Sequence, residues 1–190
     1  MDSRLIEVGH PETRSSVRVY EGGDGPELLF LHGAGGLFSD DPFLESLANH
    51  YRVYAPLLPG FEDSEGGDHL RGMLDFTLHA FDVFDALSLH QPLVVGHSMG
   101  GMIAQTIASE YPDRTKSLVS IMSTTGAKHL PEMTNETEGN FRNFGEGNFG
   151  EIDVEQMHSY GFYPESMPRQ LTAIFHAGDR SEQVKDINVK

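Results

Sequence analysis

The stretch VVGHSMGG, residues 94–101, decides the fold that we predict for this chain. It closes the apolar run QPLVVG (91–96), which has the pattern of a buried strand. The segment that follows, MGGMIAQTIASEYPD (99–113), has the spacing of a helix that Pro112 closes. Ser98 therefore stands at a sharp turn from strand to helix, with a glycine on either side that lets neighbouring backbone pass close by.

The pattern G-x-S-x-G at residues 96–100 indicates a nucleophile. Such a turn strains the serine backbone and holds its hydroxyl clear of the sheet. The helix that begins there directs its positive end toward a reacting oxygen, and the N–H of Met99 points to where an oxyanion forms. The alternative is a Gly/Ser-rich turn that packs a helix against a sheet. The strand before Ser98 and the helix after it favour the functional interpretation.

A second glycine-rich loop, HGAGG (32–36), follows another apolar run, ELLFLHG (27–33). The carboxyl ends of parallel strands share one edge of a sheet, where ligands bind. The N–H of Ala34 is therefore a candidate for the second oxyanion donor, the alternative being a plain flexible turn. We assign Gly33, Gly35 and His97 to the substrate-binding wall.

The remaining pattern alternates strands and helices. It predicts an α/β fold, a mostly parallel sheet with helices on both faces. The strands are expected at 15–21, 27–31, 51–55, 92–96 and 116–122, and the helices at 41–50, 70–89 and 99–113.

The character of the chain changes after STTG (123–126). Residues 127–150 include GNFRNFGEGNFG (139–150), which we interpret as a loop with no core of its own. Two helical stretches are expected near 151–159 and 165–177. We therefore divide the chain into a core, residues 1–126, and a cap or lid, residues 127–190.

Composition limits the classes of partner. The chain of 190 residues carries 13 Lys+Arg and 29 Asp+Glu, a formal net charge of -16, which repels nucleic acid and anionic membranes. It has no cysteine, which excludes disulfides and thiolate metal sites and fits a reducing compartment. The N-terminus has no signal-peptide pattern, and no apolar run has membrane-spanning length. We expect a cytoplasmic protein, and no metal, because His129, His158 and His176 lack metal-ligand spacing.

The motifs resemble those of the α/β-hydrolase superfamily, in particular an esterase-like subgroup. The resemblance covers LFLHGAGG (29–36), YRVYAPLLPGFEDSEG (51–66), LVVGHSMGGMIAQTIASEYPDR (93–114), LVSIMSTTG (118–126) and GFYPESMPRQLTAIFHAGDR (161–180). Glu62 replaces a glycine that is usual in the second of these. The resemblance implies hydrolysis of esters, lactones or similar acyl compounds without a cofactor. It also implies Ser98 as nucleophile, with Ala34 and Met99 supplying the oxyanion N–H groups.

The same resemblance implies an acid and a histidine after the last strands of the sheet. This chain ends at SEQVKDINVK (181–190), so neither stands in its expected place, and we expect the C-terminal strands to be missing. Asp179 is a candidate acid, and His158 and His176 are candidate bases that a lid brings over Ser98. His97 is expected to point into the packing beneath the turn, and His32 is expected to be structural.

Three hypotheses remain open at this stage. The first is a serine-dependent ester hydrolase, weakly active because the acid and histidine are missing. The second is a non-catalytic protein that binds a small acyl or aromatic ligand. The third is an incomplete chain that needs a partner to supply strands. The apolar edge at 116–122 is an aggregation hazard, so we expect a second copy or residues 127–190 to cover it.

Overall fold

A computed structural model describes residues 1–190 except 13, 131–133, 149, 160–162 and 190. Its sheet has six strands in the order β1-β2-β4-β3-β5-β6. β3, β4, β5 and β6 run parallel, while β1 and β2 are antiparallel to their neighbours. This confirms the mostly parallel sheet. The strands are β1 (Asp2–Val8), β2 (Ser15–Gly22), β3 (Glu27–Leu31), β4 (Arg52–Pro56), β5 (Leu93–His97) and β6 (Ser117–Ile121).

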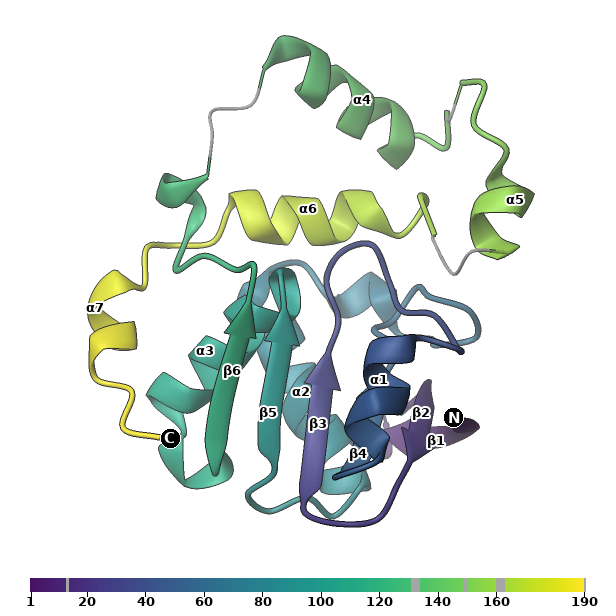
Figure 1. Cartoon of the computed structure of the whole chain (residues 1–190). Coiled ribbons are helices and arrows are strands. Elements are labelled where there is room, and N and C mark those ends of the chain that lie inside the picture. Colours follow the sequence, from purple (N-terminus) through teal and green to yellow (C-terminus); the bar gives the residue numbers. More distant parts are fainter. Residues whose placement is uncertain (13, 131–133, 149, 160–162, 190) are drawn as a thin grey trace.

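Helices cover both faces of the sheet, as predicted (Figure 1). α1 (Pro42–Ala48) lies on one face, and α2 (Met73–Ala86) and α3 (Met99–Glu110) lie on the other. The start of α1 is fixed locally, because the Asp41 carboxylate accepts the N–H of Phe43 at 2.8 Å. Pro42 occupies the first helical position, where its missing N–H costs nothing.

The two central strands carry the core that positions the site. Leu29 in β3 and Val94 in β5 are at most 1% exposed, and Phe84 of α2 and Ile103 of α3 are fully buried against the sheet. Burial on both faces explains why these strands are continuous apolar runs rather than alternating ones. The loops after β3 and β5 consequently start from fixed points.

The C-terminal helical segment, residues 127–190, lies across the carboxyl edge of the sheet. It contains α4 (Asn135–Gly145), α5 (Val154–Ser159), α6 (Met167–Phe175) and α7 (Ser181–Lys185). Figure 1 shows α6 passing over the ends of β3, β5 and β6, with α4 beyond it. Throughout the described part of the chain, no helix has the length and apolar character needed to span a bilayer.

The loop predicted over residues 139–150 is wrong in its first half, where α4 extends to Gly145. Thr134 explains the difference, because its hydroxyl accepts the N–H of Thr137 at 3.1 Å and caps the helix. Glu136 in the first turn and Arg142 in the last turn also match the helix dipole. These local interactions offset the helix-breaking tendency of the glycines.

The C-terminal helical segment is tied to the core at both ends of α6. At one end, the Ser166 hydroxyl donates to the carbonyl of Gly60. At the other end the N–H of Arg180 donates to the carbonyl of Thr125 in the core at 2.8 Å. Next to this bond, Ala127 N–H donates to the carbonyl of Ala177 at 3.2 Å, within the segment itself. The position of α6 above the strand ends is thereby fixed.

The outer edge of β6 is less protected than we expected. β6 is the last strand of the sheet, and Val119 in its middle is 51% exposed. The described part of residues 127–190 thus leaves Val119 exposed, and of the two expected covers the second copy of the chain remains a prediction. An exposed apolar edge strand is a template for pairing with another chain. We propose that a second copy of the chain covers it.

Replacement of Val119 by lysine should prevent this association, because a charge on an edge strand opposes pairing. The wild-type chain should show a mass that rises with concentration in size-exclusion chromatography with light scattering, and V119K should remain monomeric. The matched control is L5K, since Leu5 is 46% exposed on the opposite edge strand β1. A wild-type chain that stays monomeric at every concentration would contradict the proposal.

Candidate active site

Ser98 has a backbone conformation that side chains rarely adopt. Its φ is 52° and its ψ is -116°, at the junction of β5 and α3. A non-glycine residue held there costs roughly 1–3 kcal/mol. The N–H of Ser98 donates to the carbonyl of Ile121 at 2.9 Å, and its own carbonyl accepts from Gly101 N–H at 3.0 Å and from the Ser123 hydroxyl at 2.8 Å. These bonds hold the strained turn from both sides, as the G-x-S-x-G pattern predicts.

The glycines that flank Ser98 are required by space. A Cβ on Gly96 would lie 2.3 Å from the carbonyl oxygen of Gly100, and a Cβ on Gly100 would lie 2.0 Å from that of Leu31. Real Cβ atoms do not approach backbone so closely. The first turn of α3 therefore rests directly on the backbone of β3 and β5, which brings Ser98 to the carboxyl edge of the sheet.

The loop HGAGG lies against this serine. A Cβ on Gly33 would be 2.9 Å from the Cβ of Ser98, so the two residues are direct neighbours. The N–H of Gly36 donates to the carbonyl of Gly33 at 3.1 Å, which closes the loop into a tight turn that contains Ala34 and Gly35. The structure thus brings the two glycine-flanked loops together.

His32 fixes the orientation of this loop. Its Nδ1 lies 2.6 Å from the carbonyl of Gly33, and its Nε2 lies 2.9 Å from the N–H of Leu58. The carbonyl only accepts and the N–H only donates, so His32 is the neutral tautomer with the proton on Nδ1. In a trans peptide the C=O and the following N–H point in opposite directions. The N–H of Ala34 therefore points away from His32.

Two backbone donors near Ser98 have no acceptor among the described residues. Ala34 is 7% exposed and Met99 is fully buried, and among the described residues no group accepts the N–H of either. Buried backbone N–H groups without a partner are rare in folded proteins. A pair of them beside one serine is suited to bind a negatively charged oxygen.

A cavity of ≈ 200 Å³ opens above Ser98. Its wall is mostly apolar and includes three methionines, whose flexible side chains adapt to varied apolar groups. The described lining residues are Ser98, Met99, Met102, Met122, Ser123, Thr124, His129, Leu130 and Ile174. A larger hollow of ≈ 380 Å³ shares Met102 and Thr124 with it but is not lined by Ser98.

The histidine adjacent to the serine does not lie where we expected. His97 is only partly buried, and a Cβ on Gly33 would be 3.2 Å from its Nδ1. The prediction that His97 points into the packing beneath the turn is therefore wrong. As the last residue of β5, it instead lies beside the tight turn of Gly33.

The other predicted acid–base residues lie away from Ser98. His158 stacks on Tyr163 with ring centroids 4.7 Å apart, and its Nε2 is 2.6 Å from Glu165. His176 and Asp179 line the larger hollow instead of the cavity that contains Ser98. Within the described part of the chain, no side chain forms a hydrogen bond with the Ser98 hydroxyl.

The sequence reasoning missed His129 as a site residue, although the structure places it in the wall of the Ser98 cavity. The sequence analysis names His129 only among the histidines that lack metal-ligand spacing. The available signal was its position soon after the carboxyl end of β6, the edge where ligands bind in such sheets. No cluster of three or more metal-ligating side chains occurs in the described residues.

Comparison with known families agrees with this geometry. Residues 26–160 match the model of the alpha/beta hydrolase fold family, and the chain belongs to that family. A pimeloyl-[acyl-carrier protein] methyl ester esterase from Aeromonas hydrophila is 34% identical over 111 residues. A 2-hydroxymuconate semialdehyde hydrolase from Pseudomonas sp. is 33% identical over 120 residues. The matches cover 57% and 60% of this chain but only 42% of either relative.

Solved structures show the same fold. A hydrolase from Pseudomonas aeruginosa superposes with a TM-score of 0.72 at 18% identity, covering 98% of this chain and 77% of that one. A thermophilic esterase from Thermogutta terrifontis gives a TM-score of 0.72 at 17% identity, covering all of this chain and 78% of that one. The chain is thus shorter than the hydrolases whose fold it shares.

Replacement of Gly100 by alanine should strongly destabilise the protein, because the new Cβ would lie 2.0 Å from the Leu31 carbonyl. Overpacking of this kind costs about 1–3 kcal/mol and more where backbone must move. Urea unfolding measures the change. The control is G139A in α4. A Cβ added at Gly139 would meet no described atom within 4 Å, and alanine has a higher helix propensity than glycine. Equal stability of G100A and the wild type would contradict the close packing of α3.

The stability of the fold should fall on the acid side of neutrality because of two buried histidines. Burial lowers the pKa of His32 and of His79 to about 4, from an ordinary value of 6.5. Below pH 6.5 the unfolded chain binds protons that the folded chain does not. Stability is therefore lost as the pH falls from 6.5 to 4, by up to about 3 kcal/mol for each group.

Urea unfolding at several pH values tests this loss. H79Q should reduce the pH dependence by about one proton, because it removes one of the two groups. H90Q is the matched control for the replacement of a histidine, since His90 is exposed. The account of the buried imidazoles fails if wild-type stability is equal at pH 7.5 and pH 5.

Proposed function

We propose that this chain hydrolyses carboxylic esters or related acyl compounds, with Ser98 as the nucleophile. The observation that carries the proposal is the strained Ser98 beside the unpaired N–H groups of Ala34 and Met99. These two groups would bind the oxyanion. Gly33 and Gly35 keep the loop close to the reacting carbon, and His97 lines the approach beside them.

The proposed reaction uses the geometry in two stages. The Ser98 oxygen attacks the carbonyl carbon of the ester, and the carbonyl electrons move onto an oxygen that the two N–H groups stabilise. Collapse of this intermediate releases the alcohol and leaves an acyl group on Ser98, which water removes. Oxyanion donors of this kind contribute about 2.7–4 kcal/mol each to lowering the barrier. No step requires a cofactor or a metal.

The size of the cavity supports a small acyl group. A volume of ≈ 200 Å³ with a methionine-rich wall fits a short apolar chain better than a charged or extended one. The relatives include a methyl ester esterase and a semialdehyde hydrolase, which agrees with a hydrolase that acts on esters or related compounds. The net charge of -16 disfavours nucleic acid and anionic membranes as partners. The C-terminal helical segment would act as a cap, since α6 crosses above the site.

We propose that turnover is slow. A serine hydroxyl is a weak nucleophile until a base removes its proton. No described side chain forms a hydrogen bond with the Ser98 hydroxyl. Enzymes that lose such partners retain roughly 10³ to 10⁴ of rate over water from oxyanion donors and binding.

Hydrolysis of p-nitrophenyl acetate by the wild-type chain and by S98A tests the proposal. We expect slow, saturable release of p-nitrophenol by the wild type, with its acyl-enzyme burst abolished in S98A. A fluorophosphonate probe should label the wild-type chain at Ser98, as peptide mass spectrometry would show. The matched control is S46A, because Ser46 is an exposed serine on α1, remote from the cavity.

The outcomes separate the hypotheses. Hydrolysis that S98A leaves unchanged would contradict the proposal and support a protein that binds ligands without chemistry. Fast turnover that S98A abolishes would contradict the slow rate but keep Ser98 as nucleophile. Activity that appears only when a second chain is added would support the incomplete chain that needs a partner.

A further inference from the structure

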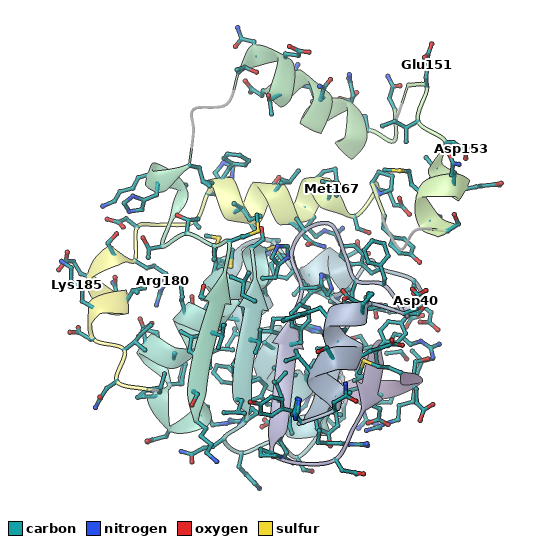
Figure 2. The ribbon with its side chains drawn as sticks, viewed as in Figure 1. Asp40, Glu151, Asp153, Met167, Arg180 and Lys185 are labelled. Carbon is teal, nitrogen blue, oxygen red and sulfur yellow. The ribbon has the colours of Figure 1, made fainter. Side chains whose placement is uncertain are left out.

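His129 lies where two distant segments of the chain cross. It ends a short 3₁₀ turn, Ala127–His129, that follows the carboxyl end of β6. Residues 177–181 pass beside this turn, held by the two backbone hydrogen bonds that join 125–127 to 177–180. Figure 2 labels Arg180 at this crossing, between the end of α6 and α7. The crossing brings Asp179 and Ser181 to His129, although they are some 50 residues apart in sequence.

A chain of hydrogen bonds connects His129 to a carboxylate. His129 Nε2 lies 2.9 Å from the Ser181 hydroxyl, and that hydroxyl donates to Asp179 Oδ1 at 2.6 Å. Nε2 itself is 3.7 Å from the same oxygen. Since an ionised carboxylate only accepts, the Ser181 proton is directed to Asp179 and the Ser181 oxygen accepts the Nε2–H of His129. This leaves Nδ1 of the neutral imidazole with its lone pair.

The carboxylate at the end of this chain is held firmly. Lys128 donates to its other oxygen, Oδ2, and the N–H of Ser181 donates to Oδ1 at 3.0 Å. The hydrogen bond from Lys128 and those from Ser181 hold the pKa of Asp179 well below its ordinary range. Asp179 therefore stays ionised wherever an imidazole is neutral, and it keeps the proton of His129 on Nε2.

The free nitrogen belongs to a residue of the Ser98 cavity. Among the described residues that line this cavity, His129 is the one with a titratable side chain. The other lining residues are methionine, serine, threonine, leucine and isoleucine, which cannot accept a proton near neutral pH. In the described part of the chain, Nδ1 of His129 has no hydrogen-bond partner.

We propose that His129 is the general base for Ser98, oriented through Ser181 by Asp179; this inference rests on the proposed function. As the Ser98 oxygen bonds to the ester carbon, its proton passes to Nδ1 of His129. The imidazolium then gives that proton to the departing alkoxide, which leaves as the alcohol. In the second stage the same nitrogen takes a proton from water as the water oxygen bonds to the acyl carbon. It returns this proton to the Ser98 oxygen as the bond between Ser98 and the acyl group breaks, so that the carboxylic acid leaves and His129 ends each turnover neutral.

The open cavity between His129 and Ser98 limits the rate of proton transfer to this base. His129 and Ser98 line the same cavity but form no hydrogen bond with each other, so a bridging water or an approach of the 127–130 turn must connect them. A base that works across such a gap is consistent with the slow turnover proposed above. It also makes the C-terminal helical segment part of the catalytic apparatus, since Asp179 and Ser181 both belong to it.

A purely structural role predicts different behaviour. In that case the side chains only stabilise the crossing of the two segments. The hydrogen bonds come from Lys128, Asp179 and Ser181, and His129 adds one more. His129→Gln distinguishes the two roles, because a glutamine amide can still donate to Ser181 but has no basic nitrogen. H176Q is the matched control, since His176 lines the neighbouring hollow rather than the Ser98 cavity.

The rate at which the fluorophosphonate probe labels Ser98 at different pH values tests the proposal. Asp179 and Lys128 are the charged groups that the contacts place beside His129. The wild-type rate should rise with pH, because a neutral imidazole accepts a proton and an imidazolium does not. H129Q should lose this rise and react about 100-fold more slowly at pH 8. Added imidazole should restore part of the rate in H129A.

Each result supports or overturns the inference. H129Q that labels as fast as the wild type, with the same pH dependence, overturns His129 as the base and leaves Ser98 as nucleophile. H176Q that loses the pH-dependent rise, with H129Q unaffected, assigns the base to His176 instead. A wild-type chain that the probe does not label at Ser98 overturns the proposed function and the inference together.

Discussion

The contact between the first turn of α3 and the backbone of β3 is the constraint on which the site depends. Position 100 lies against the Leu31 carbonyl, so only a glycine fits, and α3 sits lower on the sheet than a side chain would permit. Ser98 must then complete the turn from β5 within a single residue, at a φ of 52°. The strain at Ser98 is thus a consequence of packing, held by the bonds to Ile121 and Ser123.

The same contact aligns the second loop. Because α3 lies close to the end of β3, Gly33 falls next to Ser98, and Ala34 follows it in the same tight turn. His32 then sets the direction of the Ala34 N–H by holding the Gly33 carbonyl. The arrangement needs a fully buried imidazole, which weakens the fold in acid. The direction of the Ala34 N–H and the stability of the fold in acid therefore both depend on the side chain of His32.

Local patterns predicted the parts of the fold that local physics controls. The apolar runs of β3 and β5 and the glycines around Ser98 were sufficient, because burial and close approach leave few alternatives. The helix α4 was missed because its cap, Thr134, lies outside the glycine-rich repeat that we interpreted as a loop. The link between His129 and Asp179 was out of reach, since it depends on how two segments cross above the sheet. No spacing in the sequence encodes that crossing.

The central claim is that Ser98 and two backbone N–H groups form one site, and a structure of the phosphonylated chain tests it most directly. The phosphoryl oxygen of a fluorophosphonate adduct mimics the oxyanion of ester hydrolysis. The account predicts an adduct on the Ser98 oxygen, with its phosphoryl oxygen 2.7–3.1 Å from the N–H groups of both Ala34 and Met99. An adduct on another residue, or a phosphoryl oxygen directed away from these two groups, would contradict it.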